Sequence, residues 1–244
     1  MARMTAPAPL PPPAQDGPVW AGSLTTVRTA APQVVLTFDD GPQPGGTDKI
    51  LAALADTGST ATFFVLVSRA RRFPGLLDEV VAAGHEVGLH GLDHVRLTTL
   101  PPEEVRQRTA DARAELQDRI GGAVPWVRPP YGAQDRDTWA GLTHGGLTSV
   151  LWGIDQEDWR PDVDDDHRLA MALTGLAPGM IFQGHDGFAG PEDGAFDGPA
   201  PQLDRGALLR RVLAAYAEQG LVGRSLSQVL GDGGVELREE RFPV

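Results

Sequence analysis

The feature that most constrains the fold is a regular alternation of short apolar runs with longer amphipathic stretches beyond residue 30. The apolar runs, which read as strands, are residues 34–38, 61–67, 86–89, 126–128, 149–152 and 180–183. The helical stretches between and after them are residues 47–57, 75–83, 103–120, 135–143, 166–176 and 205–219. Strand and helix alternating in this way predict a single α/β domain on one parallel sheet, either open or closed into a barrel.

The charge balance limits what the protein can bind. Asp and Glu total 33 against 21 Lys and Arg, a net charge of −12 over 244 residues. A surface this acidic repels nucleic acid and anionic lipid, so a neutral or cationic substrate is expected. No apolar stretch is long enough to cross a bilayer. The absence of cysteine excludes disulfides, thiolate metal sites and a cysteine nucleophile.

Two segments differ from the alternating pattern. Residues 1–18 carry six prolines and no apolar core, which is not the pattern of a secretory signal. We therefore expect a flexible, proline-rich leader over residues 1–30 and the domain over residues 31–244. As the chain is given, this predicts a cytoplasmic protein, or a secreted or envelope protein if an export signal was trimmed. Residues 187–203, rich in Gly, Pro and Asp, indicate a lid or binding loop, or else a plain surface insertion.

Two adjacent carboxylates, Asp39 and Asp40, follow the apolar run at 34–38, and Gly41 and Pro42 turn the chain directly afterwards. Like charges this close repel each other unless a cation binds between them. The carboxyl end of a strand is also where α/β folds place their chemistry. The pair is therefore a candidate for metal or acid–base chemistry, with an acidic turn that caps the next helix as the alternative.

A pair of histidines, His90 and His94, follows the run at 86–89 with a spacing of four residues. On a helical turn, side chains at i and i+4 lie on one face, so both imidazoles could reach one ion. With an aspartate from another strand end they would form the ligand set of a zinc hydrolase or of a non-haem Fe(II) oxygenase. A chance pair of structural histidines is the remaining alternative.

Three later strand ends carry further polar side chains. Arg128 could keep a general base ionised, or form a structural ion pair. Asp158 could orient a histidine and Trp159 could line a sugar or acyl pocket, unless both belong to a solvated acidic loop. His185 is placed as a proton donor near neutrality, or as a structural histidine. The histidines without such a placement are interpreted as structural: His85, His144 and His167.

Taken together and in this order, these segments resemble the polysaccharide deacetylases of the NodB-homology type, carbohydrate esterase family 4. The likeness covers about residues 33–230, and five motifs in the right order make it specific. The motifs are residues 37–42, 90–94, 128–132, 158–159 and the segment that contains His185. The resemblance implies a distorted (β/α) barrel of seven or eight parallel strands in a single domain.

The resemblance also implies a role for each motif residue. The implied catalytic residues are Asp39 as general base, Arg128 orienting that base, His185 as general acid and Asp158 tuning that acid. The implied metal ligands are Asp40, His90 and His94. The implied substrate-binding residues are Tyr131, Pro130, Trp159 and Gln183, and the main-chain N–H of Tyr131 would help to hold the oxyanion.

Three positions depart from the family pattern. Gly91 stands where a Ser or Thr hydroxyl usually braces the loop, and Leu89 stands where Asn is common. Gln183 stands where a leucine usually packs against the acetyl methyl group, and a polar group there is costly unless it is hydrogen-bonded. These departures imply an altered acyl pocket, or a substrate other than an ordinary N-acetyl sugar.

The implied function is metal-dependent removal of acetyl groups from N-acetylated, and also O-acetylated, sugars with release of acetate. Zinc is the expected ion, with cobalt, nickel and manganese as other candidates, and the expected partner is an acetylated sugar or oligosaccharide bound by a monomer. An Fe(II)-dependent oxygenase and a catalytically weak carbohydrate-binding protein remain as alternatives. Hydrolases of ring amides such as allantoin often have altered metal motifs, so the intact Asp40, His90 and His94 argue against them.

Overall fold

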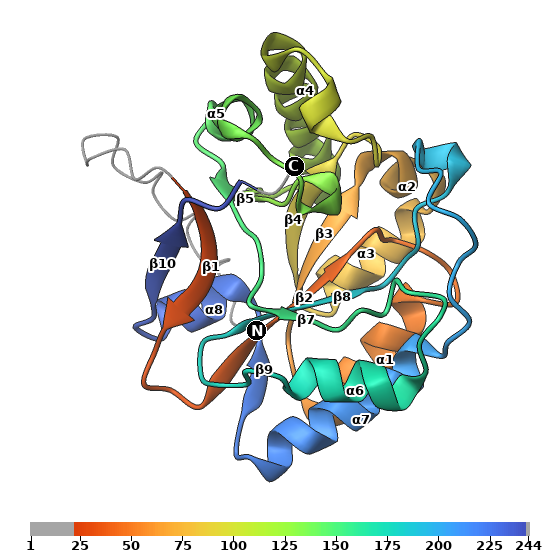
Figure 1. Ribbon diagram of the computed structural model, residues 1–244, viewed down its shortest axis with the longest axis vertical. Helices are drawn as coiled ribbons and strands as arrows, with labels where there is room; N and C mark the ends of the chain where they lie inside the picture. The colour runs from red at the N-terminus through yellow and green to blue at the C-terminus, as the bar shows by residue number, and fades with distance from the viewer. Residues whose placement is uncertain (1–21, 243–244) are drawn as a thin grey trace, which may run out of the picture.

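The computed structural model describes residues 22–242 and is organised around one sheet (Figure 1). The strands follow the order β6-β5-β4-β3-β2-β8-β7, and β9 also pairs with β2. These strands are β2 (Gln33–Asp39), β3 (Thr62–Leu66), β4 (Glu86–Gly91), β5 (Trp126–Val127), β6 (Thr148–Ser149), β7 (Ile154–Asp155), β8 (Ile181–His185) and β9 (Val222–Arg224). Every ladder between them is parallel, as the alternation predicted.

Except for the last one, Leu226–Gly231, the helices cover the outer side of this curled sheet (Figure 1); the last packs with Val35 of β2 on its inner side. The helices are α1 (Thr47–Thr57), α2 (Val67–Arg72), α3 (Pro74–Ala82), α4 (Pro102–Ile120), α5 (Arg136–Thr143), α6 (Asp165–Leu173), α7 (Arg205–Glu218) and α8 (Leu226–Gly231). Three short 3₁₀ turns are η1 (Leu97–Thr99), η2 (Pro130–Gly132) and η3 (Pro191–Asp193). Helix α7 packs between α1 and α6, and α4 packs against α5. The arrangement confirms the distorted (β/α) barrel in a single domain.

A two-stranded antiparallel ribbon of β1 (Ser23–Arg28) and β10 (Val235–Glu239) lies beside the sheet, at the left of Figure 1. Leu24 of β1 forms a bridge to Val150, directly after β6, and Thr26 forms one to Met180, directly before β8. The expected leader over residues 1–30 was therefore drawn too long, because residues 23–28 form a strand with a buried face. Residues 1–21 of that leader lie outside the described residues.

The two-residue period of a strand separates core from site along β2. Val34, Leu36 and Phe38 are buried in the cluster that includes the helix residues of α1 and α7. Val35 belongs to a second cluster, which includes residues of β1 and α8. Asp39 is in phase with Val35, so it faces the inside of the curled sheet at the strand's carboxyl end.

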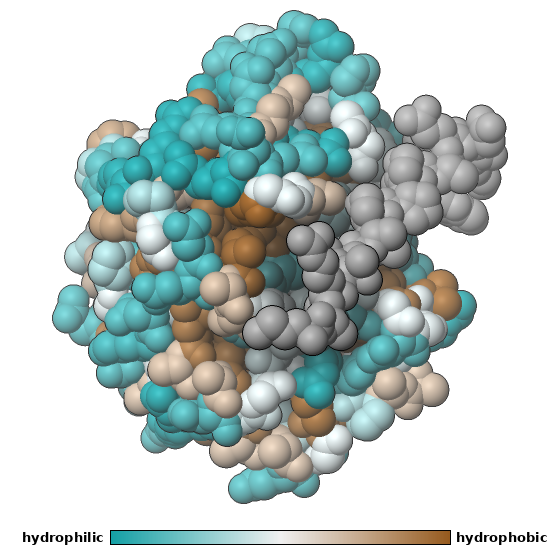
Figure 2. Space-filling model, turned by 180° about the vertical axis from the view of Figure 1, so that it is seen from behind, coloured by the Kyte–Doolittle hydropathy of each residue, from teal (hydrophilic) through white to brown (hydrophobic). Residues whose placement is uncertain are grey.

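The outer surface is mostly hydrophilic. Figure 2 shows the molecule from behind: hydrophilic residues cover most of this face, and hydrophobic residues gather in a hollow near its centre. Exposed charged side chains on the helices form ion pairs, such as Arg71 of α2 with Glu115 of α4 at 2.5 Å. Within residues 22–242, no helix combines the length and the apolar character that a bilayer crossing needs.

Candidate active site

Three predicted ligands converge at the carboxyl end of the sheet. Asp40 follows β2, His90 lies in β4, and His94 lies in the bend after β4. All three are buried, and one ligand atom from each lies within 4.8 Å of the others. Nε2 of His90 and Nε2 of His94 are each 3.3 Å from Oδ1 of Asp40. The convergence that the metal hypothesis requires is therefore present.

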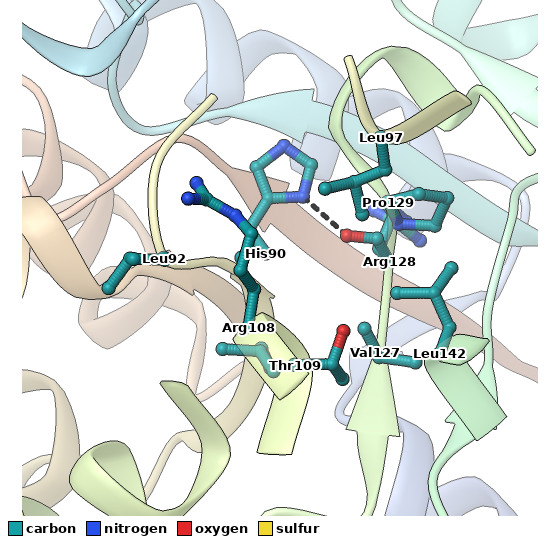
Figure 3. A pocket seen from close by; sticks show the side chains of 11 residues that line it. His90, Leu92, Leu97, Arg108, Thr109, Val127, Arg128, Pro129 and Leu142 are labelled. Carbon is teal, nitrogen blue, oxygen red and sulfur yellow. Dashed lines mark hydrogen bonds between the residues drawn. The ribbon is translucent and has the colours of Figure 1, made fainter. Parts of the chain in front are cut away.

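The hydrogen bonds show that this cluster is suited to a cation. Nδ1 of His90 donates to the main-chain oxygen of Arg128 at 2.8 Å, so in the neutral imidazole the lone pair is on Nε2 (Figure 3). That lone pair faces Oδ1 of Asp40, an atom with no hydrogen-bond donor within residues 22–242. Burial acts to raise the pKa of Asp40, but the positive charges that His94, His90 and His185 carry when protonated hold it well below its ordinary value. Two imidazoles and an anionic carboxylate form a site for a divalent metal.

The expected helical turn between the two histidines is wrong. His90 is on a strand that ends at Gly91, and the next helical turn, η1, begins only at Leu97. Gly91 has a φ of 122°, and a Cβ there would lie 2.9 Å from the main-chain oxygen of Asp93. This glycine reverses the chain, so the two side chains meet through a bend and not through helical spacing.

Asp39 and Asp40 are adjacent in sequence but reach different parts of the site. Asp40 adopts the left-handed region with a φ of 73°, a conformation that aspartate tolerates better than most residues. The next residue must be small, because a Cβ on Gly41 would lie 1.9 Å from Oδ2 of Asp186. Asp186 accepts hydrogen bonds from the Gly41 N–H at 3.1 Å and the Thr47 hydroxyl at 2.5 Å. These contacts hold the turn that separates the two carboxylates.

Arg128 fixes the carboxylate of Asp39. Its Nη1 is 2.7 Å from Oδ1 of Asp39 and 2.8 Å from Oγ1 of Thr37. Nε and Nη2 donate to the main-chain oxygens of Val150 and Leu151 at 3.2 and 3.1 Å. The guanidinium is fully buried, so its orientation is determined by these four contacts. Charge-assisted bonds of this kind are shorter and stronger than bonds between neutral groups, so the carboxylate of Asp39 is held firmly in place.

His185 forms the second polar pair, with Asp158. Its Nδ1 is 2.6 Å from Oδ1 of Asp158, and its main-chain N–H donates to Oδ2 at 2.9 Å. Arg205 at the start of α7 donates to the same Oδ2 at 2.7 Å and to the His185 carbonyl at 2.9 Å. Burial acts to lower the pKa of His185, but Asp158, with Asp40 and Asp39, raises it to about 9. The imidazole is therefore protonated at neutral pH.

Gln183 connects the two pairs. The β2–β8 register places Gln183 opposite Thr37 and His185 opposite Asp39. Nε2 of Gln183 donates to Oδ2 of Asp39 at 3.0 Å and lies 3.1 Å from Nε2 of His185, where it can donate only while that nitrogen is unprotonated. The buried amide nitrogen is bonded, but its Oε1 has no hydrogen-bond partner within residues 22–242, so the cost expected for a polar group here is only partly offset. A leucine at this position could form neither contact.

A cavity of about 420 Å³ joins these groups, within the range of small-molecule sites, ~300–1,000 Å³. Of the four expected substrate-binding residues, Tyr131, Trp159 and Gln183 line it with the metal ligands, the carboxylate of Asp39 and the imidazole of His185. Pro130 does not line the cavity; it is buried near Gly91 in the turn that carries Tyr131. Trp159 is 46% exposed at the cavity wall.

Several residues of the site were not found from the sequence. Those lining the cavity are Arg96, Trp152, Asp155, Pro161, Phe188, Ala189 and Asp197. Arg205, which binds Asp158, carries no local signal because it lies on a different element from its partner. For Phe188 and Asp197 the Gly- and Pro-rich composition of residues 187–203 was the one available sign. The structural histidines His85, His144 and His167 lie outside the lining.

The fold is a parallel (β/α) barrel with a histidine–histidine–aspartate metal site. An arginine-bound carboxylate and an aspartate-bound imidazole lie beside that site. These features define the class of metal-dependent hydrolases. Sequence comparison narrows the class, because the polysaccharide deacetylase family matches residues 26–150. A chitooligosaccharide deacetylase of Sinorhizobium fredii is 36% identical over 203 residues, which cover 82% of this chain and 93% of the relative. The chain belongs to the polysaccharide deacetylase family.

Solved structures agree with this assignment. The peptidoglycan deacetylase PdaC from Bacillus subtilis is similar with a TM-score of 0.68 and 27% identity, over 83% of this chain and 91% of that one. A family 4 acetyl xylan esterase from Clostridium thermocellum, solved in complex with a cobalt ion, gives a TM-score of 0.70 at 25% identity, over 82% and 90% of the two chains. The protein is therefore a metal-dependent carbohydrate deacetylase.

Proposed function

We propose that this protein removes acetyl groups from N-acetylated amino sugars in oligosaccharides of the chitin or peptidoglycan type. The observation that carries the proposal is one cavity lined by the metal ligands, by Asp39 held by Arg128, and by His185 held by Asp158. The names of the relatives, a chitooligosaccharide deacetylase and a peptidoglycan deacetylase, support this substrate class.

The first half of the reaction needs a base. A divalent metal held by Asp40, His90 and His94 supplies Lewis acidity that polarises the acyl carbonyl and makes water more acidic. Asp39 takes a proton from the attacking water while the oxygen of that water bonds to the acyl carbon. Arg128 holds the carboxylate of Asp39 oriented for this step. The main-chain N–H of Tyr131 is the proposed donor to the oxyanion.

The second half needs an acid. The imidazolium of His185 gives its Nε2 proton to the amide nitrogen as the carbon–nitrogen bond breaks, because an unprotonated amine is a very poor leaving group. Asp158 stabilises the imidazolium through Nδ1. Acetate and the free amine leave. Solvent then removes the proton from Asp39 and restores the proton of His185, so the balance is one water consumed per acetyl group.

Removing the metal should lower acetate release by about 100-fold or more, because Lewis-acid stabilisation amounts to several kcal/mol. The measurement is acetate release from N-acetylglucosamine oligomers before and after dialysis against a chelator. Readdition of zinc should restore release. Zinc is the proposed ion because two imidazoles and one carboxylate with an open position form a catalytic zinc ligand set. Undiminished release from chelator-treated protein would remove the metal from the mechanism.

The same assay separates the alternatives. Cobalt, nickel and manganese are tested beside zinc, and acetylated xylan is included because one structural relative is named an acetyl xylan esterase. An Fe(II)-dependent oxygenase would consume dioxygen and turn over only with iron. A catalytically weak carbohydrate-binding protein would bind the oligomers but release no acetate with any of the four metals. The pairs Arg128–Asp39 and Asp158–His185 beside the metal ligands favour hydrolysis over the oxygenase and the binding protein.

Gln183→Leu should raise kcat/KM for N-acetyl substrates by roughly 3- to 10-fold. The substitution frees Nε2 of His185 from the amide and offers the acetyl methyl an apolar wall, a contact of about 0.8 kcal/mol per methylene-sized group. An N-formyl substrate, which lacks the methyl group, is the matched control and should gain less. A fall in kcat/KM for both substrates would show that the amide bridge is required for turnover.

A further inference from the structure

The segment after β8 is built around a buried carboxylate, Asp193. This side chain is 1% exposed and accepts hydrogen bonds from Nε and Nη2 of Arg69 at 2.9 and 2.7 Å. Arg72 and the hydroxyl of Ser68, both on α2, also donate to it. In Figure 1 the η3 turn that contains Asp193 lies next to α2, as these contacts require. Residues 188–195 are therefore held as a fixed wall, not as a free lid or a plain insertion.

Arg69 also binds the start of this wall. Its Nη2 donates to the main-chain oxygen of Phe188 at 2.6 Å, and its Nη1 donates to the side-chain oxygen of Gln43. That same oxygen of Gln43 accepts the N–H of Phe188 at 2.9 Å. The guanidinium is 3% exposed, so it connects both ends of the segment from the inside.

Two main-chain groups of the wall reach metal ligands. The N–H of Ala189 donates to Oδ2 of Asp40 at 3.2 Å. The main-chain oxygen of Asp193 accepts the N–H of His94 at 2.7 Å. Ala189 thus orients the carboxylate whose other oxygen faces the two histidines, and Asp193 fixes the backbone of the second histidine. Two of the three ligands are positioned by one segment.

Gly91 makes this support necessary. The bend from Gly91 to His94 begins with a positive φ and has no hydroxyl side chain at its first position. Asp93 within the bend is bound from α4 by Arg108, at 2.6 and 2.8 Å. The bond from His94 to Asp193 holds the backbone of the second metal ligand, whose ring also packs on Tyr131 with 4.3 Å between the ring centroids.

We infer that Arg69 and Asp193 are positioning residues for the metal centre: their ion pair fixes residues 188–195, and that segment sets the placement of Asp40 and His94. The inference rests on the metal site of the proposed function. Partners that orient metal ligands typically change metal affinity by about 10- to 100-fold when removed. Since neither residue is a ligand, their loss should weaken metal binding without abolishing it.

The test is calorimetric titration of zinc alone into chelator-stripped protein. Arg69→Gln and Asp193→Asn should each weaken zinc binding by about 10- to 100-fold. The matched control is Arg71→Gln, two residues away on α2, whose side chain is 53% exposed and pairs with Glu115. The control should bind zinc as the unchanged protein does. No substrate is involved, so the result does not depend on whether deacetylation is observed.

A second readout separates positioning from general loss of structure. Circular dichroism and thermal melting of the metal-free variants report folding, and the visible absorption of bound cobalt reports ligand geometry. Folded variants with weaker zinc binding and an altered cobalt spectrum support the inference. If Arg69→Gln fails to fold, the milder substitution Asp193→Asn provides the test of the inference. The inference would be overturned if a folded Arg69→Gln or Asp193→Asn variant had the same zinc affinity and cobalt spectrum as Arg71→Gln.

Discussion

Asp39→Asn should lower kcat for deacetylation by about 10²–10⁴-fold while zinc affinity stays nearly unchanged. The asparagine keeps the shape of the side chain and its oxygen can still accept from Arg128, but the amide cannot take a proton from water. Asp39 is not one of the three groups whose atoms converge on the metal position. Turnover and metal binding should therefore separate in this variant.

The comparison variant is His90→Ala, which removes a metal ligand from β4. It should lose zinc affinity and turnover together, because one of three donors is gone. Steady-state acetate release and zinc titration are measured on both variants under the same conditions. An Asp39→Asn protein that keeps full turnover would show that another group accepts the proton.

The sequence was informative wherever neighbours along the chain decide the structure. The apolar runs correspond to strands of the parallel sheet, and the carboxyl ends of those strands carry Asp39, His90 and His185, which therefore meet. The two-residue period explains why Gln183 and His185 lie on one face of β8. The adjacent carboxylates at the end of β2 were a correct sign of a metal site.

What the sequence did not reveal depends on contacts between distant segments. Strand β1 pairs with β10 more than 190 residues later, so the start of the domain was placed too far along the chain. The two-residue strand β7 is too short to show a period. The four-residue spacing of His90 and His94 suggested a helix, because side chains four residues apart meet on a helical turn. A bend at Gly91 brings the same two side chains together, and the spacing alone does not distinguish the two. The partners of Asp193 and Asp158 come from α2 and α7, and no local pattern marks them.

His185→Ala should lower kcat on N-acetylglucosamine oligomers by about 10²–10⁴-fold, yet leave p-nitrophenyl acetate hydrolysis much less affected. The sugar amine leaves only when it is protonated, whereas nitrophenolate is stable as an anion and needs no acid. Both substrates still need the metal and Asp39, so the ester is an internal control for the rest of the site. Equal losses on the two substrates would mean that His185 supports folding or metal binding and is not the acid.

The pH profile tests the same assignment in the unchanged enzyme. Asp158 raises the pKa of His185 to about 9, so the acid form persists through neutral pH and is lost as the pH rises through that value. A bound cation offsets the charge of Asp40, which contributes to the shift, so the alkaline limb of kcat should lie at or somewhat below about 9. Asp158→Asn removes the main group that opposes burial, and it should therefore move the limb to lower pH. A limb that stays in place in Asp158→Asn would assign the titration to a group other than His185.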